Sequence, residues 1–281
     1  MFKRFLSRTF RHTALGLSLG LSLGLSASAV WAQTPNTEVQ WLGQSAFKIT
    51  TPGGKTVITD PWLKANPLTP PEYKNLENLG KVDVLLVSHA HWDHFADAPA
   101  LALMHNVKMY APGDMNQTAT LLGILPPELL PRFNKSGTVE PAPGVHVTAV
   151  HAEHSSVLVW KNPSTGKDEA HVGGEPLGFI ITLENGFKIY HMGDTGLFGD
   201  MKLIADFYKP DLVLVPIGGN FTMGPTEAAY ALKAWFKPQA VIPMHYGANP
   251  LAKGTAAQFV ESMQGSGIPV LALKPGERAK F

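Results

Sequence analysis

The chain of 281 residues contains no cysteine, and this absence excludes two classes of exported protein. A disulfide scaffold and a lipid anchor on cysteine both require this residue. Charged residues are also scarce, at 16%, whereas hydrophobic residues make up 44%. Such a composition is typical of a folded chain with a sizeable core rather than a disordered one.

Positive charge is scarce beyond the first 32 residues. Four of the 23 lysines and arginines lie in residues 1–32 with none of the 22 acidic residues, which leaves 19 basic against 22 acidic side chains. No block of basic residues interrupts residues 33–281, so we expect no nucleic acid partner. No long polar linker divides this part of the chain either, which favours a single domain.

Residues 1–32 have the pattern of a cleavable signal peptide. Basic residues lie between Lys3 and Arg11, and an apolar stretch over 14–27 leads to two cleavage patterns of small residues, which end at Ala29 and Ala32. We expect cleavage after Ala32 and export to a bacterial periplasm. The apolar stretch is shorter than the ~20 residues of a membrane helix, so we expect no stable membrane span in the mature protein. An uncleaved anchor is the alternative.

Short apolar segments alternate with amphipathic ones along the rest of the chain. The predicted strands are 39–49 with a bend at Gly43, 55–60, 81–87, 107–110, 145–150, 177–183, 187–191, 211–215, 240–242 and 269–273. The predicted helices are 95–103, 114–123, 199–207, 225–236 and 255–263. We interpret 62–80, 126–144 and 161–176 as loops that shape a substrate pocket, with a plain connecting loop as the alternative for 62–80. The pattern favours two sheets packed face to face with helices outside.

The run Ser88–His94 carries three imidazoles and one carboxylate directly after a predicted strand. These side chains are ligands of Zn²⁺, Mn²⁺ or Fe²⁺. Their spacing predicts two metal ions, with His89 and His91 facing one, and Asp93 and His94 facing the other. A sheet holds such ligands rigidly, as a metal site requires.

Other acids and imidazoles also follow predicted strands. They are Asp60, His151 or His154, Asp194 and His245. Their recurrence at strand ends predicts that they converge with the 89–94 cluster. His151 and His154 lie three residues apart, which in extended chain places them on opposite faces, so we expect only one of them to bind metal.

These motifs resemble those of the metallo-β-lactamase-fold superfamily, from about Val39 to the end of the chain. Its H-x-H-x-D-H signature is similar to His89, His91, Asp93 and His94. The resemblance implies an α/β fold, a four-layer αββα sandwich, in which residues 33–281 form one hydrolase domain. Two segments, 218–225 and 243–246, resemble uncharacterised metal-dependent hydrolases akin to ascorbate-phosphate lactonase-like proteins and N-acyl-phosphatidylethanolamine phospholipase D. The export signal departs from many members of that branch, which are cytoplasmic.

The resemblance also implies roles for the site residues. One metal would take His89, His91 and His154, the other Asp93, His94 and His245, and Asp194 would bridge both. Asp60 would support the cluster without binding metal, and Asp93 and Asp194 would be catalytic. Tyr246 and Asn220 are candidate substrate contacts. Zn²⁺ is the expected ion, and Mn²⁺ or Fe²⁺ fits the same ligands.

The implied reaction is hydrolysis of a small ester, lactone, amide or phosphoester by a hydroxide that bridges two metals. The alternative is a non-hydrolytic metal-binding or redox protein on the same scaffold. Diiron redox members usually replace the second histidine of the signature with glutamate, and that position is His91 here. The missing cysteine does not match the commonest lactamase pattern. We therefore expect a small-molecule substrate and two divalent metal ions.

Overall fold

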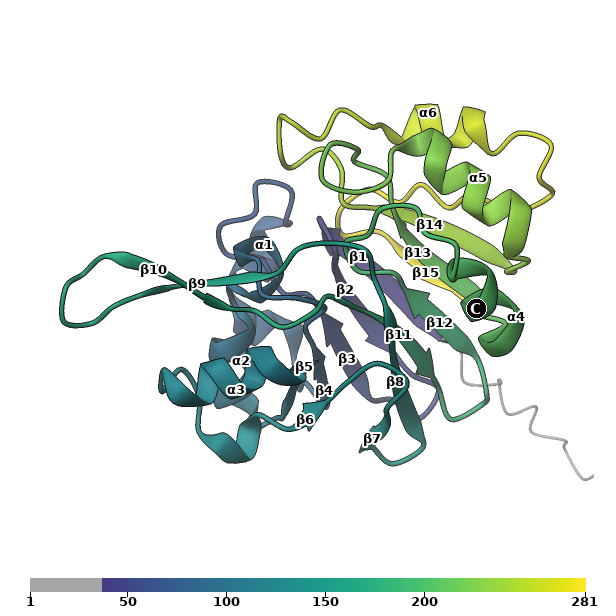
Figure 1. Cartoon of the computed structure of the whole chain (residues 1–281). Coiled ribbons are helices and arrows are strands. Elements are labelled where there is room, and N and C mark those ends of the chain that lie inside the picture. Colours follow the sequence, from purple (N-terminus) through teal and green to yellow (C-terminus); the bar gives the residue numbers. More distant parts are fainter. Residues whose placement is uncertain (1–36) are drawn as a thin grey trace, which may run out of the picture. The chain divides into compact units, whose positions relative to one another are not determined.

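Two mixed sheets form the centre of the computed structural model, which describes residues 37–281 (Figure 1). The first sheet has the order β15 (Arg278–Lys280), β1 (Glu38–Gly43), β2 (Ala46–Thr50), β3 (Thr56–Thr59), β4 (Val84–Leu86), β5 (Met109–Pro112) and β6 (Arg132–Phe133). The second has the order β14 (Ala240–Met244), β13 (Leu212–Pro216), β12 (Lys188–His191), β11 (Leu177–Thr182), β8 (Val145–His151) and β7 (Thr138–Ala142). The predicted signal peptide and cleavage site lie outside the described residues.

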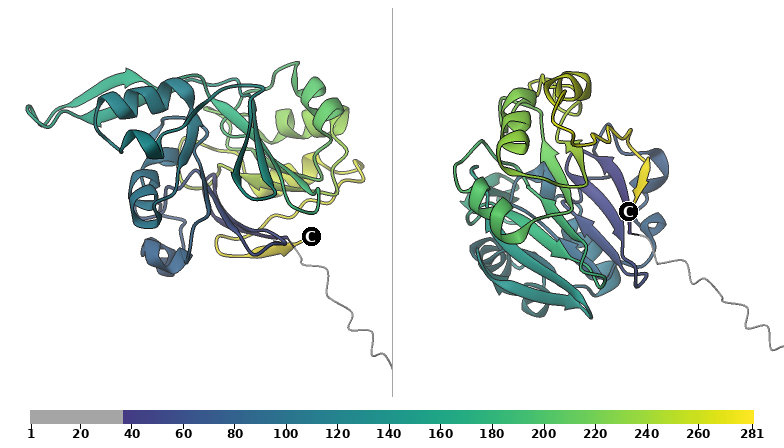
Figure 2. Two further views of the ribbon diagram at one scale, coloured as in Figure 1. Left: turned by 90° about the horizontal axis from the view of Figure 1, so that it is seen from below. Right: turned by 90° about the vertical axis from the view of Figure 1, so that its right-hand side faces the viewer.

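Helices cover the outer face of each sheet (Figures 1 and 2). The first sheet carries α1 (Trp92–Phe95), α2 (Ala98–His105) and α3 (Gly113–Leu121), with the 3₁₀ turns η1 (Pro71–Lys74), η2 (Leu76–Leu79) and η3 (Pro127–Leu129). The second sheet carries α4 (Met201–Tyr208), α5 (Pro225–Trp235) and α6 (Ala256–Ser262). Between residues 37 and 281, no helix combines the length and the apolar character needed to cross a bilayer.

Alternating side chains on the strands create three apolar layers. Val57 of β3 and Leu212 of β13 point into the core between the sheets. Their neighbours point away from it, Ile58 toward the helices of the first sheet and Val213 toward those of the second. Successive strand residues face opposite sides of a sheet, so both faces of each sheet are buried. This arrangement confirms the predicted four-layer αββα sandwich.

The strands that precede the candidate ligands all end at the same edge. β3, β4 and β5 are parallel neighbours in the first sheet, as are β12, β13 and β14 in the second. β8 also runs parallel to β12, because each pairs antiparallel with β11. The carboxyl ends of these strands therefore meet where the two sheets open toward solvent, which is the usual place for a ligand site in α/β sheets.

Three predictions of local structure are wrong. Residues 269–273 form no strand, and within this segment only Val270 makes a single bridge, to Val241 of β14. Pro243 of β14 has no N–H to extend the ladder, and the N–H of Leu273 donates to the carbonyl of Leu271 at 3.0 Å instead. The predicted loop 161–176 instead contains most of a projecting hairpin, β9 (Val157–Lys161) and β10 (Asp168–Val172). The predicted loop 126–144 contains η3, β6 and β7.

Candidate metal centre

The loop after β4 carries four candidate donor side chains between His89 and His94. His89 and His94 are fully buried, whereas His91 and Asp93 are partly open to solvent. The N–H groups of His94 and Phe95 both donate to the carbonyl of His91, at 3.0 Å each, and close the single turn of α1. This turn directs Asp93 and His94 toward the second sheet.

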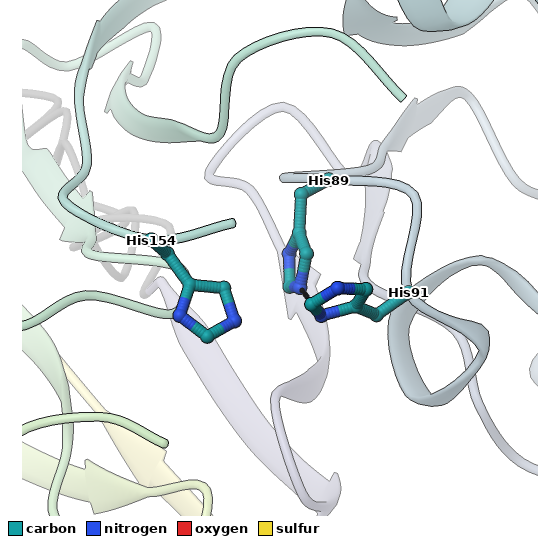
Figure 3. Close-up of side chains that lie close together, drawn as sticks. All are labelled: His89, His91 and His154. Carbon is teal, nitrogen blue, oxygen red and sulfur yellow. Dashed lines mark hydrogen bonds between the residues drawn. The ribbon is translucent and has the colours of Figure 1, made fainter. Parts of the chain in front are cut away.

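Three histidines converge in what we call the histidine cluster: His89, His91 and His154 (Figure 3). One ring nitrogen of each lies within 4.8 Å of the others. His89 Nε2 and His91 Nδ1 are 2.9 Å apart, as the dashed line in Figure 3 marks. His151 does not join them, since its Nε2 lies 3.2 Å from Glu153 and its ring packs edge-on against Phe198. The structure thus places His154, and not His151, beside the signature histidines.

A second group, the mixed cluster, consists of Asp93, His94 and His245. His245 Nε2 lies 3.5 Å from Asp93 Oδ2, and His94 Nε2 lies 3.7 Å from the same oxygen. His245 follows β14 with φ at +56°, an uncommon left-handed backbone conformation for this residue type. Its N–H donates to the carbonyl of Gln44 at 3.0 Å, which ties the end of β14 to the first sheet.

Asp194 lies between the two clusters. Its Oδ1 is 3.3 Å from His94 Nε2, and its Oδ2 is 2.9 Å from His245 Nε2 and 3.6 Å from His154 Nε2. Asp194 also forms a third donor group with His89 and His94. One carboxylate therefore reaches donors of both clusters.

The arrangement fits metal ions better than a network of hydrogen bonds. Among the described side chains, His94 Nε2, His245 Nε2 and Asp194 Oδ1 are buried and have no hydrogen-bond partner. For His245 Nε2 this holds even though Asp194 Oδ2 is only 2.9 Å away. Buried polar atoms that converge without pairing are costly unless a cation accepts their lone pairs. Imidazole and carboxylate together suit Zn²⁺, Mn²⁺ or Fe²⁺.

The carboxylates give the mixed cluster a strong preference for positive charge. Burial lowers the pKa of His245, but Asp194 and Asp93 outweigh it and raise the pKa to about 9. Burial raises the pKa of Asp93, but His94 and His245 outweigh it and bring the pKa to about 2. Without a metal ion, protons on the imidazoles thus supply the positive charge that the carboxylates attract.

The histidine cluster has the opposite character. Burial, followed by repulsion from neighbouring imidazoles, lowers the pKa of all three of its histidines. They therefore stay neutral, which is the form that binds a metal ion.

Asp60 lies behind the metal-binding loop and makes hydrogen bonds to Ser88 and His94. Its Oδ1 accepts the N–H of Ser88 at 2.6 Å, and its Oδ2 accepts the Ser88 hydroxyl at 2.7 Å. His94 Nδ1 lies 2.9 Å from the same Oδ2. His191 is buried nearby, and its Nε2 lies 3.0 Å from the carbonyl of Ser45, so it contacts the backbone of the first sheet.

Gln44 is a site residue that the sequence did not single out. It lies in the turn between β1 and β2 with φ at +51°, and its Nε2 donates to Asp93 Oδ2 at 2.9 Å. Only 2% of this residue is exposed. A glutamine in a turn looks like a surface residue, and the only available signal was its place next to Gly43 at a strand end.

A cavity of about 330 Å³ lies over the two clusters. Besides the cluster residues, its lining includes Trp92, Ser155, Phe221 and Asn249. The loops predicted to shape the pocket, 62–80, 126–144 and 161–176, contribute no lining residue.

The two candidate substrate contacts also lie outside the lining of this cavity. Tyr246 stacks on Trp41, with ring centroids 5.2 Å apart. Asn220 is exposed and occupies a left-handed position at φ +61°. The N–H groups of Gly219 and Phe221 donate within the loop, to the carbonyls of Met223 and Gly219 respectively, so neither is free to bind a substrate.

Comparison with known proteins identifies the family. The sequence profile of the beta-lactamase superfamily domain matches residues 38–245. A "UPF0173 metal-dependent hydrolase" of a Polaromonas species is 72% identical over 89% of this chain and 93% of its own length. A relative of the same description from Polynucleobacter asymbioticus is 59% identical over 91% of this chain and 90% of its own length.

A solved structure agrees with these relatives. Igni18, described as a novel metallo hydrolase from Ignicoccus hospitalis, is 29% identical, with a TM-score of 0.74 over 88% of this chain and 98% of its own. The resemblance to the superfamily, inferred from the motifs, is thereby confirmed. The chain belongs to the beta-lactamase superfamily and, within it, to the UPF0173 metal-dependent hydrolases.

Proposed function

We propose that this chain hydrolyses a small ester, lactone, amide or phosphoester with two divalent metal ions, one at each cluster. The observation that carries the proposal is the position of Asp194, whose two oxygens face donors of both clusters at 2.9 to 3.6 Å. A single site would not need two separate donor sets joined by one carboxylate.

The donors divide between the two ions as the clusters do. His89, His91 and His154 would hold one ion, Asp93, His94 and His245 the other, and Asp194 would bridge them. Three protein donors and a bridge leave room for a further ligand, which distinguishes catalytic from structural sites. When bound, the ions would supply a hydroxide near neutral pH and polarise the attacked group. Zn²⁺ is the expected ion, with Mn²⁺ or Fe²⁺ as alternatives.

The chain's own carboxylates would then orient the attacking water. Asp93 and Asp194 line the cavity, and Gln44 fixes Asp93 by a hydrogen bond of 2.9 Å. An unprotonated carboxylate oxygen at this position would accept a hydrogen bond from the water and so turn a lone pair of the water oxygen toward the substrate. Burial raises the pKa of Asp194, but His245 and His94 outweigh it and hold the pKa well below its usual range. Both carboxylates are therefore available as acceptors.

The metal content and one matched pair of variants test the proposal. The purified protein should contain about two ions per chain, and His91→Ala should abolish hydrolysis across a panel of esters, lactones, amides and phosphodiesters. His146→Ala is the control, since His146 is exposed on β8 and belongs to neither cluster. A content of one ion, or hydrolysis that survives in His91→Ala, would contradict the two-metal site.

We also propose that the mature chain begins after Ala32 and works in the periplasm. The support is the sequence pattern of residues 1–32, in which a basic start and an apolar stretch precede small residues. Fractionation of the producing bacterium and sequencing of the mature amino terminus test this. Retention of Met1 in a cytoplasmic fraction would refute it.

A further inference from the structure

Two aromatic side chains lie uncovered on the wall of the cavity over the clusters. Trp92, which begins α1, is 60% exposed, and Phe221, in the loop between β13 and α5, is 42% exposed. Large apolar groups left open in a concave site usually bind an apolar part of a ligand. They come from the first and the second half of the chain respectively, so they line the cavity from different elements.

The ring of Trp92 and the backbone of Phe221 are restrained by contacts. The ring of Trp92 packs edge-on against Trp62, with centroids 4.6 Å apart and an interplanar angle of 86°. The N–H of Phe221 donates to the carbonyl of Gly219 at 2.7 Å, in the tight loop that the left-handed Asn220 closes. Groups that are already restrained lose less conformational entropy when a ligand binds, which favours binding at this wall.

The charge of the lining is as informative as its aromatic groups. Among the residues described by the structure, no lysine or arginine lines the cavity. Its carboxylates and its three histidines belong to the proposed donor sets, and the other polar lining residues, Ser155 and Asn249, are neutral. A substrate with an anionic group away from the clusters would leave that charge without a partner, which is costly. Enzymes that transfer phosphoryl groups commonly add arginine or lysine to the metal for this reason.

We propose that the substrate is an uncharged carboxylic ester or lactone whose apolar group lies against Trp92 and Phe221. This inference rests on the proposed function and narrows it to carbonyl substrates without fixed charge. The reaction adds one water across the acyl C–O bond: the acyl carbon gains a hydroxyl group, and the departing oxygen gains a proton. Ser155 and Asn249 offer neutral hydrogen bonds to the ester oxygens.

Four chromogenic probes test the charge preference on the metal-loaded protein. They are 4-nitrophenyl hexanoate, the 4-nitrophenyl monoester of adipic acid, 4-nitrophenyl 6-(trimethylammonio)hexanoate and bis(4-nitrophenyl) phosphate. The hexanoate and adipate esters have the same acyl length and differ by one terminal carboxylate. We expect kcat/KM for the hexanoate to exceed that for the adipate by about 10- to 100-fold, the cost of an unpaired charge. The phosphodiester and the cationic ester should also be poorer substrates than the hexanoate.

Variants of the wall test the aromatic contribution. Trp92→Ala and Phe221→Ala should raise KM for the hexanoate several-fold more than KM for 4-nitrophenyl acetate, with kcat and metal content little changed. Trp92→Phe should restore the low KM, because it keeps an aromatic face. Phe207→Ala is the control, because Phe207 is 73% exposed on α4 and lines a different cavity.

The outcomes separate the two proposals. A preference for the adipate, the cationic ester or the phosphodiester over the hexanoate would overturn the inference. Equal changes of KM for the hexanoate and the acetate in Trp92→Ala and Phe221→Ala would also overturn it. Hydrolysis of all four probes at similar rates would overturn it while leaving the proposed function intact. If none of the probes is hydrolysed and the chain binds fewer than two ions, both the proposed function and this inference are overturned. If none is hydrolysed although two ions are bound, this inference alone is overturned.

Discussion

Asp60 determines which nitrogen of His94 faces the cluster. The hydrogen bond between Asp60 Oδ2 and His94 Nδ1, at 2.9 Å, leaves Nε2 as the nitrogen turned toward Asp93 and Asp194. Ser88 fixes the carboxylate in turn, through its N–H and its hydroxyl. Loss of a residue that orients a metal-binding imidazole in this way typically lowers metal affinity or activity by about 10- to 100-fold.

Gln44 should act on the metal site in the same indirect manner. Gln44→Met removes the hydrogen bond to Asp93 Oδ2 and keeps a similar side-chain volume in a position that is 2% exposed. We expect the affinity of the mixed cluster for its ion to fall by about 10- to 100-fold, because Asp93 loses the group that orients it. Competition with a chelator of known affinity measures this change.

Gln239→Met is a matched control for this variant. Gln239 Nε2 also donates to an aspartate, Asp211 Oδ1 at 3.0 Å, but at an exposed position that belongs to neither cluster. This substitution should leave metal affinity unchanged. Equal affinity in the Gln44 and Gln239 variants would show that Asp93 needs no support from the turn.

At the residue scale, the sequence indicates candidate donors where chemistry restricts the choice of side chain. Imidazoles and carboxylates at strand ends are rare enough to stand out, so all the predicted donors could be named before their geometry was known. Gln44 and Phe221 could not be found in this way. A glutamine or phenylalanine is common in any protein, and only the contacts of the folded chain show that one touches Asp93 and the other lines the cavity.

At the scale of elements, the hairpin of β9 and β10 illustrates what the sequence conceals. Its strands are mostly exposed and polar or β-branched, so no long apolar run marks them. Two apolar side chains of the hairpin, the fully buried Leu158 and the half-buried Trp160, pack into the helical layer of the first sheet. Two anchors are too few to produce a recognisable period in the sequence.

Adjacent residues of the hairpin should contribute very differently to stability, because successive side chains of a strand point to opposite faces. Leu158→Ala should lower the free energy of unfolding by about 2–5 kcal/mol, because Leu158 is fully buried. Val159→Ala should change it by no more than about 0.5 kcal/mol, because the adjacent Val159 is 53% exposed. Urea unfolding of the metal-loaded protein measures both, and equal losses would contradict the packing described.

The base of the hairpin also contacts the metal-binding loop. The hydroxyl of Ser156 accepts the N–H of Ala90 at 3.2 Å and donates to the carbonyl of Gly173 at 2.9 Å. Ala90 lies between His89 and His91, so the two ends of the hairpin help to fix the histidine loop. The hairpin lies next to this loop because β8, which leads into the hairpin, ends at the same edge as β4, which leads into the loop.

At the scale of the whole described chain, each cluster draws donors from both sheets. The signature residues follow β4 in the first sheet, whereas His154, Asp194 and His245 follow β8, β12 and β14 in the second. The sequence could predict that parallel strands bring these ends to one edge. It could not predict how closely the two edges approach, because that depends on the packing of the core between the sheets.

Metal ions bound between the donors of the two sheets would link the sheets, so removing the ions should destabilise the fold. When the free ion concentration is about 100 times the Kd of one site, binding stabilises the native state by ~2.7 kcal/mol, provided that the ion does not bind the unfolded chain. We expect a chelator to lower the urea midpoint of the wild-type protein, and His154→Ala, which removes a donor of the second sheet, to show a smaller metal-dependent shift. His146→Ala, with its exposed histidine outside both clusters, should keep the full shift. If the chelator leaves the wild-type midpoint unchanged, the donors do not join the sheets through metal, and the core alone must hold them together.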